Sequence, residues 1–234
     1  MNNWAALAEL EREDRILAEI CCGYGAVVFA AIIFSPISLG FAGVFPLKTA
    51  LNRLQKINRI RRVMKAMLSE FGDDIVITPR VPVPGEQPID MIIKFPRQAL
   101  FLVSIRSKGK KRVFFKEKTK TLSLKSKTRK GLSDWKPDPL IELGNYQRWL
   151  KKNRLELGLS SKELKLPFAK VLVLAGETDI HPHEEHLYLT MGNQKFLWVN
   201  ARGTSALIRI EEIVEFTKCY LAYQAEKRKQ LLHS

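Results

Sequence analysis

The chain lacks the residue patterns that define several common enzyme classes. Its three cysteines, Cys21, Cys22 and Cys219, give neither a disulfide framework nor a C-x-x-C metal spacing. There is no G-x-x-x-x-G-K-[ST] phosphate loop and no G-x-S-x-G nucleophile turn. The sequence therefore gives no support for a disulfide-stabilised scaffold, a P-loop nucleotidase or a serine hydrolase of the elbow type, and a reducing compartment is expected.

Acidic residues are few relative to basic ones. The 234 residues include 39 Lys and Arg against 24 Asp and Glu, which gives a formal net charge of +15. A surplus of this size favours an anionic partner, which is nucleic acid, an acidic lipid surface or an acidic protein. The hydrophobic fraction of 46% is sufficient for a folded core, so the length predicts one domain with attached segments.

Charge is absent altogether from Ile20 to Leu47, a run of 28 residues. About 20 apolar residues suffice to cross a bilayer, so residues 20–47 are predicted to be a membrane segment. Pro36 interrupts the run and leaves two topologies open. One helix spans the bilayer with a kink at Pro36, or two half-helices enter the membrane and return. A buried apolar helix in a soluble core is the third interpretation.

The flanking charges favour a single span with the soluble part in the cytoplasm. Basic residues follow the segment at positions 48, 53, 56, 59, 61, 62 and 65, and positive flanks stay on the cytoplasmic side. Residues 1–19 are expected to form an amphipathic helix. Residues 48–72 are expected to form a second, basic amphipathic helix that ends at Gly72.

Residues 73–216 predict an α/β domain in which a mixed sheet is covered by helices. The expected strands are 74–78, 89–95, 99–105, 112–115, 168–174 and 196–200. A helix is expected after Asp138-Pro139, and another at 210–223. Residues 116–136 are expected to be a loop or a weak edge hairpin, and 217–234 the end of the last helix with a basic, frayed tail.

The segment Pro88–Gly109 predicts a tight hairpin that carries several polar side chains. Asp90 lies near the start of its first strand, and Ser104 and Arg106 lie near the end of its second. Strand alternation places Ser104, Arg106 and Lys108 on one face. The plain structural interpretation is that Asp90 caps a turn or pairs with Arg106.

From about Lys65 to Phe216 the chain resembles the NERD (nuclease-related) domain, a branch of the restriction-endonuclease-like fold. Ile89-Asp90 and the strand FLVSIRSKG are similar to the family's "ID … ExK" pattern, and Pro137–Glu142 is similar to its "NPxxQ" helix entry. The later apolar strand, Val171–Leu174, is a third match. The resemblance implies a restriction-endonuclease-like mixed sheet flanked by helices.

The same resemblance implies relict catalytic positions at Asp90, Ser104, Arg106 and Lys108. Such a site needs two carboxylates to hold Mg²⁺ and a lysine near the metal. Here serine stands at the acid's position, and arginine, which stays protonated, stands at the lysine's. We therefore expect no second acid opposite Asp90, no bound cofactor and no catalysis. An active Mg²⁺ nuclease would need Lys108 as the lysine near the metal and either Glu70 or Glu142 as the second carboxylate.

Residues 106–130 concentrate the basic charge, with twelve Lys or Arg and one acid, Glu117. Lysine, arginine and hydroxyl side chains suit contacts with phosphate groups, while Phe114 and Phe115 either stack on bases or pack as strand core. A solvated loop is the alternative interpretation. The candidate polyanion-binding residues are Arg106, Lys108, Lys110, Lys111, Arg112, Lys116, Lys118, Lys120, Lys125, Lys127, Arg129 and Lys130.

His181, His183 and His186 form an H-x-H-x-x-H cluster that is a candidate transition-metal site. The simpler interpretation is a polar turn after the strand that ends near Leu174.

Taken together, these patterns predict a membrane-anchored, catalytically inactive nuclease-like protein that binds nucleic acid or another polyanion through its basic segment. A first alternative is an accessory subunit of a membrane protein complex that docks on an acidic protein or a lipid surface. The second alternative is an active Mg²⁺ nuclease with a rebuilt site.

Overall fold

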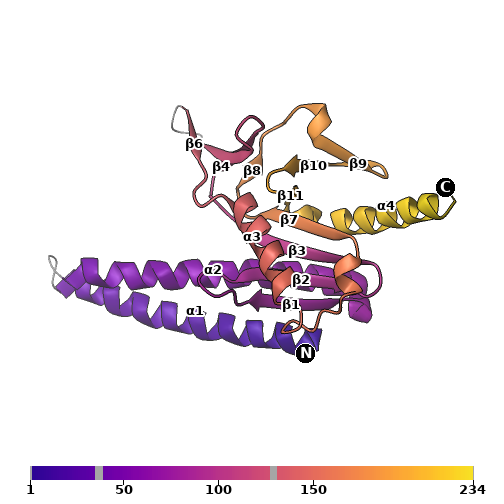
Figure 1. Cartoon of the computed structure of the whole chain (residues 1–234). Helices are drawn as coiled ribbons and strands as arrows, with labels where there is room; N and C mark the ends of the chain where they lie inside the picture. Colours follow the sequence, from indigo (N-terminus) through magenta and orange to yellow (C-terminus); the bar gives the residue numbers. More distant parts are fainter. Residues whose placement is uncertain (1, 35–38, 127–130, 234) are drawn as a thin grey trace. The chain divides into compact units, whose positions relative to one another are not determined.

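The structure is a computed structural model that describes residues 2–34, 39–126 and 131–233. Within these ranges it describes side chains except at residues 24, 27–34, 39–47, 232 and 233. The chain divides into two compact units, Met1–Lys65 and Ala66–Ser234, and each is treated by itself below. Figure 1 shows the elements and their labels.

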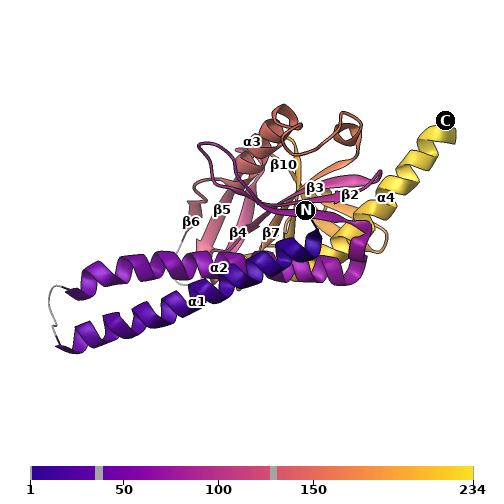
Figure 2. The same cartoon turned by 90° about the horizontal axis from the view of Figure 1, so that it is seen from below.

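The first unit consists of two long helices, α1 (Asn3–Phe34) and the part of α2 (Leu39–Phe71) up to Lys65. The two helices run antiparallel, side by side (Figures 1 and 2). Three ion pairs join them, with N–O distances of 2.5–2.7 Å. The pairs are Arg53–Glu13, Arg61–Asp14 and Lys65–Glu11.

The two antiparallel helices give the hairpin arrangement rather than one helix continued through Pro36, which lies outside the described residues. Most of the predicted membrane segment, residues 27–47, lies outside the described side chains. Among the residues that are described, no helix has the length and apolar character required to cross a membrane. Ile20, the first residue of the predicted segment, has an exposed side chain, as do Ile16 and Leu51 beside the segment.

The second unit is built on a seven-stranded mixed sheet with the strand order β1-β2-β3-β7-β11-β10-β9. Strands β1, β2 and β3 are antiparallel neighbours, β3 pairs with β7 in parallel, and β7 pairs with β11 in parallel. The bounds are β1 (Val76–Val81), β2 (Ile89–Phe95), β3 (Ala99–Arg106), β7 (Phe168–Leu174), β9 (Tyr188–Met191), β10 (Gln194–Asn200) and β11 (Thr204–Arg209).

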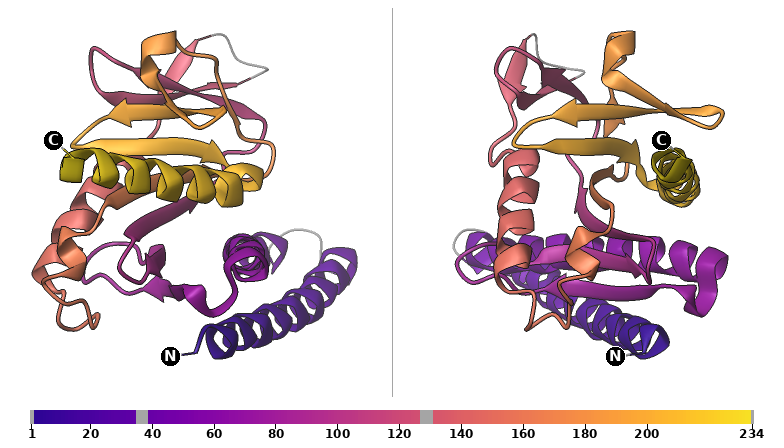
Figure 3. Two further views of the ribbon diagram at one scale, coloured as in Figure 1. Left: turned by 90° about the vertical axis from the view of Figure 1, so that its right-hand side faces the viewer. Right: turned by 45° about the vertical axis from the view of Figure 1, so that its right-hand side comes forward.

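Helices cover both faces of this sheet, as Figure 3 shows in its right-hand view. On one face, α3 (Pro139–Lys152) buries Leu140, Leu143 and Tyr146 in the cluster that contains the apolar side chains of β2, β3 and β7. On the other face, α4 (Ile213–His233) sets Phe216 and Tyr220 against Phe101 of β3, with ring centroids 6.4 and 5.2 Å apart. Burial on both faces explains the unbroken apolar sequence of the central strands.

A smaller four-stranded sheet has the order β6-β5-β4-β8. Its central pair is the antiparallel hairpin of β4 (Lys111–Lys116) and β5 (Thr121–Ser126). The edge strands are β6 (Leu132–Asp134) and β8 (Asp179–Ile180). The hairpin's inner face buries Val113, Phe115 and Leu122, which anchors it to the core.

The predicted mixed α/β architecture with flanking helices is confirmed. The described part of residues 116–136 forms β5, a central strand of the small sheet, and β6, an edge strand, where a loop or a weak edge hairpin was predicted. Helix α2 ends at Phe71 as predicted, before Gly72 with its positive φ of 54°. Strands β9 and β11 and the separate small sheet were not predicted. The prediction of a frayed tail after Glu226 is wrong, because α4 continues to His233 through residues with high helix propensity.

Candidate functional site

The candidate site is a buried ion-pair cluster at the end of the β2–β3 hairpin. Asp90 lies at the start of β2 and is 2% exposed. The next residue, Met91, is paired with Val103 of the antiparallel strand β3, so Asp90 lies beside Ser104. Its Oδ2 accepts hydrogen bonds from the backbone N–H of Ile105 at 2.7 Å and from Nη1 of Arg106 at 2.6 Å. The carboxylate is therefore fixed from the backbone and from a side chain at once.

Arg106, the last residue of β3, contacts two carboxylates. Its Nη2 donates to Oε2 of Glu142 at 3.0 Å, while its Nη1 donates to Asp90. Burial disfavours the charged guanidinium, but the attraction of Asp90 and Glu142 outweighs it and raises the pKa of Arg106 above its ordinary value. Arg106 is therefore permanently charged in this cluster.

Glu142 belongs to the first turn of α3, whose position is set by Asp138. Asp138 is the N-cap, and its Oδ1 accepts from the backbone N–H of Leu140 at 2.9 Å. Its Oδ2 accepts from Leu122 of β5 at 3.0 Å, so one carboxylate ties the helix start to the small sheet. Burial and then the charge of Glu142 raise the pKa of Tyr146, one turn on, to about 12, and its phenol stays protonated at neutral pH.

The expectation that Asp90 has no acidic partner is wrong. Glu142 lies 36 positions further along the chain but contacts the same guanidinium. Glu70, the other acid considered, pairs instead with Lys218 at 2.6 Å. The sequence named both Glu142 and Glu70 as candidate acids but did not decide between them, because the contact depends on how α3 packs on the sheet.

The other two relict positions do not complete a catalytic set. Ser104 is 1% exposed, and its Oγ has no hydrogen-bond partner among the described residues. The Nζ of Lys108 lies 5.4 Å from the ring centroid of Trp135, and its backbone N–H donates to Thr178. Lys108 is thus committed to a cation–π contact with Trp135.

The residues present do not fit a resident Mg²⁺ ion. Two carboxylates from β2 and α3 are the ligand type that this ion requires. A guanidinium cation already bonds to both of them, with two hydrogen bonds at 2.6 and 3.0 Å. A cation held in this way repels a second one, so a metal ion would have to displace Arg106 to reach the two carboxylates.

The basic hairpin presents a second candidate site, directly after Arg106. Arg112, Phe114 and Lys116 face away from the buried Val113 and Phe115. Phe115 packs as core, and the ring of Phe114 stacks on His181 with centroids 3.9 Å apart, so the core interpretation holds better than base stacking.

Several of the predicted basic residues already have acidic partners. Lys110 pairs with Glu177 at 3.6 Å, and Lys116 pairs with Asp134 at 2.9 Å. No ion pair joins four other exposed cations to an acid in the described part of the chain. These four are Arg112, Lys118, Lys120 and Lys125. Lys127, Arg129 and Lys130 lie outside the described residues, and Lys111 is half-buried.

The three histidines do not share one candidate metal site. The Nε2 of His183 accepts the backbone N–H of Phe115 at 2.9 Å, and burial lowers its pKa, which keeps the ring neutral. His186 instead lies 2.8 Å from Glu117 and 3.5 Å from Glu184. The exposed trio of Glu117, Glu184 and His186 could offer ligand atoms to one ion, but exposed acidic groups commonly occur without one.

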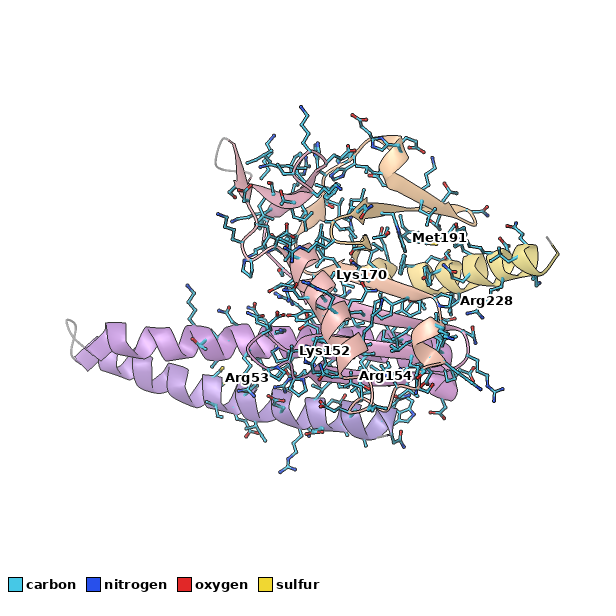
Figure 4. All side chains as sticks on the ribbon, in the orientation of Figure 1. Arg53, Lys152, Arg154, Lys170, Met191 and Arg228 are labelled. Atoms are coloured by element: carbon cyan, nitrogen blue, oxygen red, sulfur yellow. The ribbon has the colours of Figure 1, made fainter. Side chains whose placement is uncertain are left out.

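A buried lysine that we did not predict lies on the α3 face of the sheet. Lys170 in β7, which Figure 4 labels, is 3% exposed, and its Nζ donates to the carbonyl of Arg202 at 2.9 Å. Arg106 is paired with Leu174 of β7. Lys170 lies four residues before Leu174, which is about 13 Å along the strand. Lys170 is therefore no substitute for a site lysine. Its signal was a single charge within the apolar run FAKVLVL.

Comparison of the chain with protein-family models, with curated proteins and with solved structures finds no match.

Proposed function

We propose that this protein binds nucleic acid through the β4–β5 hairpin, by contacts with phosphate groups, and does not cleave it. The observation that carries the proposal is the register that sets Arg112 directly opposite Lys125. Like charges opposite each other destabilise a β-hairpin, and an anion that bridges them removes the penalty. A phosphate group meets this need, since Arg binds it with a planar pair of donors.

Two further cations extend the same surface. Lys118 and Lys120 lie in the four-residue turn of the hairpin, and both are exposed. Phosphate contacts of this kind position a polyanion without reading its sequence. We therefore define the hairpin cation set as Arg112, Lys118, Lys120 and Lys125, and we expect it to bind single-stranded and double-stranded nucleic acid without sequence preference.

The ion-pair cluster supports the proposal that the bound nucleic acid is not cleaved. An active Mg²⁺ nuclease would use Asp90 and Glu142 as metal ligands, and both hold Arg106 instead. The site therefore has a second acid but also a competing cation, Arg106. The bound guanidinium supports binding without chemistry over the active-nuclease alternative.

We also propose that the second unit is a degenerate relative of the NERD domain. Support comes from an antiparallel β2–β3 hairpin that follows α2 and β1, and from the parallel pairing of β3 with β7, which comes after β4, β5, β6 and α3 in the chain. The relict positions at Asp90 and Arg106 lie at the end of that hairpin. An experimental structure in which β3 and β7 are not parallel neighbours would remove this support.

Membrane attachment through residues 20–47, with the second unit in the cytoplasm, remains part of the proposal. Its support is the 28-residue uncharged sequence and the basic positions that follow it. The antiparallel helices favour a hairpin whose two ends lie on one side of the membrane. Membrane fractionation of the full chain tests this, with Val28→Asp/Ile32→Asp expected to release it. Unchanged distribution of that variant, or a soluble parent chain, contradicts attachment.

The binding proposal is tested by fluorescence anisotropy with a labelled 20-nucleotide strand, using the full chain in detergent. We expect the variant with Gln at all four hairpin positions to lose at least tenfold in affinity at low salt. A control variant removes the same charge elsewhere, with Gln at Lys151, Lys152, Lys227 and Lys229, all exposed. It is expected to change affinity less than threefold.

Equal losses in the two variants would contradict a localised site. Anionic vesicles and an acidic polypeptide, assayed in parallel, separate the alternatives. Binding to phosphatidylserine vesicles or to polyglutamate alone, without nucleic acid, would favour the accessory-subunit function.

A further inference from the structure

We propose that a cavity between the two sheets of the second unit binds a small organic carboxylate, with an apolar body and one negative charge. The cavity has a volume of about 230 Å³. Pockets that hold drug-sized ligands measure about 300–1,000 Å³, so the occupant is smaller than these. None of the hairpin cation set lines the cavity, and the inference does not depend on the proposed nucleic-acid binding.

The cavity forms where the chain changes sheets. After β7 of the large sheet, the chain adds β8 to the small sheet, beside β4, and then returns to the large sheet as β9 (Figure 1). Ile180 of β8 and Pro182, which follows it, line the cavity from this crossing segment, and residues of β9, β10 and β11 line it from the large sheet. The cavity is thus bounded by segments that belong to both sheets.

Strand register gives the cavity an apolar floor. Leu197 of β10 is paired with Tyr188 of β9 on one side and with Leu207 of β11 on the other. Paired residues point to the same face of a sheet, so the three side chains lie in one row. Leu197 and Leu207 belong to the buried core cluster, and Tyr188 packs against that cluster. The apolar body of a ligand therefore meets a surface that the core holds in place.

Two cations line the cavity beside this floor. Lys195 and Arg209 each lie two residues beyond the Leu197–Leu207 pair, so the period of a strand puts them on the same face as the floor. Like charges on neighbouring strands repel each other, and one anion between them removes the repulsion. A carboxylate suits this place, because its two oxygens accept hydrogen bonds from a guanidinium and an ammonium at once.

Both cations contact an acid, but these contacts are exposed to water. The Nη2 of Arg209 lies 2.6 Å from Asp179, and the two side chains are 52% and 42% exposed. Lys195 pairs with Glu185, and those side chains are 55% and 76% exposed. Exposed ion pairs contribute little to stability, so a ligand carboxylate exchanges with them readily and the displaced acids return to water.

Glu212 favours a ligand with a single charge. Its Oε2 accepts the backbone N–H of Arg209 at 2.7 Å, which holds this carboxylate at the wall of the cavity. The lining residues therefore carry two positive charges against one negative charge. A monoanion neutralises the surplus, whereas a dianion exceeds it, so an organic carboxylate fits the cavity better than a phosphate ester does.

The test is equilibrium dialysis of the full chain in detergent against radiolabelled phenylacetate, with detergent alone as the background. Phenylacetate is expected to bind at one site with a dissociation constant of about 10⁻⁴–10⁻³ M, a range suited to so small a ligand. Phenylacetamide keeps the apolar body without the charge, and acetate keeps the charge without the body. Each should bind at least about tenfold more weakly. Phenyl phosphate, which carries a second negative charge, should also bind more weakly than phenylacetate.

Two double variants assign the ligand to this cavity. Lys195→Met/Arg209→Gln should weaken phenylacetate binding at least about tenfold and leave phenylacetamide binding unchanged. Lys110→Met/Lys218→Met is the control, because it also removes two exposed cations that pair with acids, Glu177 and Glu70, and neither cation lines the cavity. It should change phenylacetate binding less than about threefold.

Three results overturn the proposal. The first is the absence of saturable phenylacetate binding by the parent chain. The second is an equal loss of binding in the two double variants. The third is binding of phenylacetamide or phenyl phosphate by the parent chain as tight as that of phenylacetate, and this comparison needs no variant to fold.

Discussion

Arg106 and Asp90 are joined by a hydrogen-bonded ion pair of 2.6 Å, in which the carboxylate side chain is 1% exposed and the guanidinium 15%. The pair links the last residue of β3 to the second residue of β2, and Glu142 extends it to α3. One guanidinium thus connects three elements of the second unit.

Asp90→Asn should destabilise the chain by about 3–5 kcal/mol, because it leaves a buried guanidinium without its main partner. The shape of the side chain is retained, so packing changes contribute little. Urea unfolding of the second unit, followed by tryptophan fluorescence, measures the loss. Glu184→Gln is the matched control, since its side chain is 82% exposed and 3.5 Å from His186, and it should cost less than about 1 kcal/mol.

A double-mutant cycle separates the ion pair from general burial effects. Asp90→Asn and Arg106→Met together should cost less than the sum of the two single changes, with a coupling of about 1–3 kcal/mol. Strict additivity would show that the two side chains stabilise the fold independently.

Asp138→Ala should cost about 2–4 kcal/mol through the loss of two interactions. The cap of α3 contributes about 1 kcal/mol, and the unpaired backbone N–H of Leu122 adds about 1–3 kcal/mol. Hydrogen exchange should quicken at Leu122 and in the first turn of α3, ahead of the rest of the sheet. An effect confined to α3 would contradict the role of Asp138 as a link to β5.

The free energy of unfolding should depend on pH through Lys170, and the sign of this dependence follows from the pKa of its side chain. Burial lowers the pKa of Lys170 to about 8, below the value of about 10.4 in an unfolded chain. The cost of burying the charge is therefore present in full below pH 8 and is relieved as the pH rises from 8 to 10.4.

Lys170→Met should accordingly be more stable than the parent chain at pH 7, by roughly 1–2 kcal/mol after the lost bond to Arg202, and the difference should shrink above pH 8. Unfolding midpoints between pH 6 and 10 measure this, with exposed Lys227→Met as the control. A difference that does not change with pH would mean that Lys170 is charged throughout.

Local patterns in the sequence predicted much of this fold. Alternation and the Pro96-Arg97 turn placed the β2–β3 hairpin, and the Asp138-Pro139 start placed α3. Pairing of Asp90 with Arg106 followed from strand register and was among the interpretations of the sequence. These features depend on neighbours within about 16 residues, whose geometry one hairpin or one helix turn determines.

Contacts between distant elements were not determined by these patterns. Glu142 was named only as one of two candidate acids, because its contact with Arg106 depends on how α3 packs across the sheet. The single charge of Lys170 does not reveal which carbonyl accepts its hydrogen bond. The small sheet depends on pairing between Arg112 and Asp179, which are 67 positions apart and have no shared pattern. Such pairs are determined by how whole helices and strands pack on one another, and the periodicity of the sequence carries no information about that packing.

The salt dependence of oligonucleotide binding tests the central claim, that the hairpin cations hold nucleic acid and the guanidinium-filled site leaves it intact. The logarithm of the association constant should fall linearly with the logarithm of salt concentration, and the slope should be smaller by about 3 with Gln at the four hairpin positions. The recovered strand should be full length after incubation with Mg²⁺ or Mn²⁺. Equal slopes for the two chains, or a shortened strand, would contradict the account.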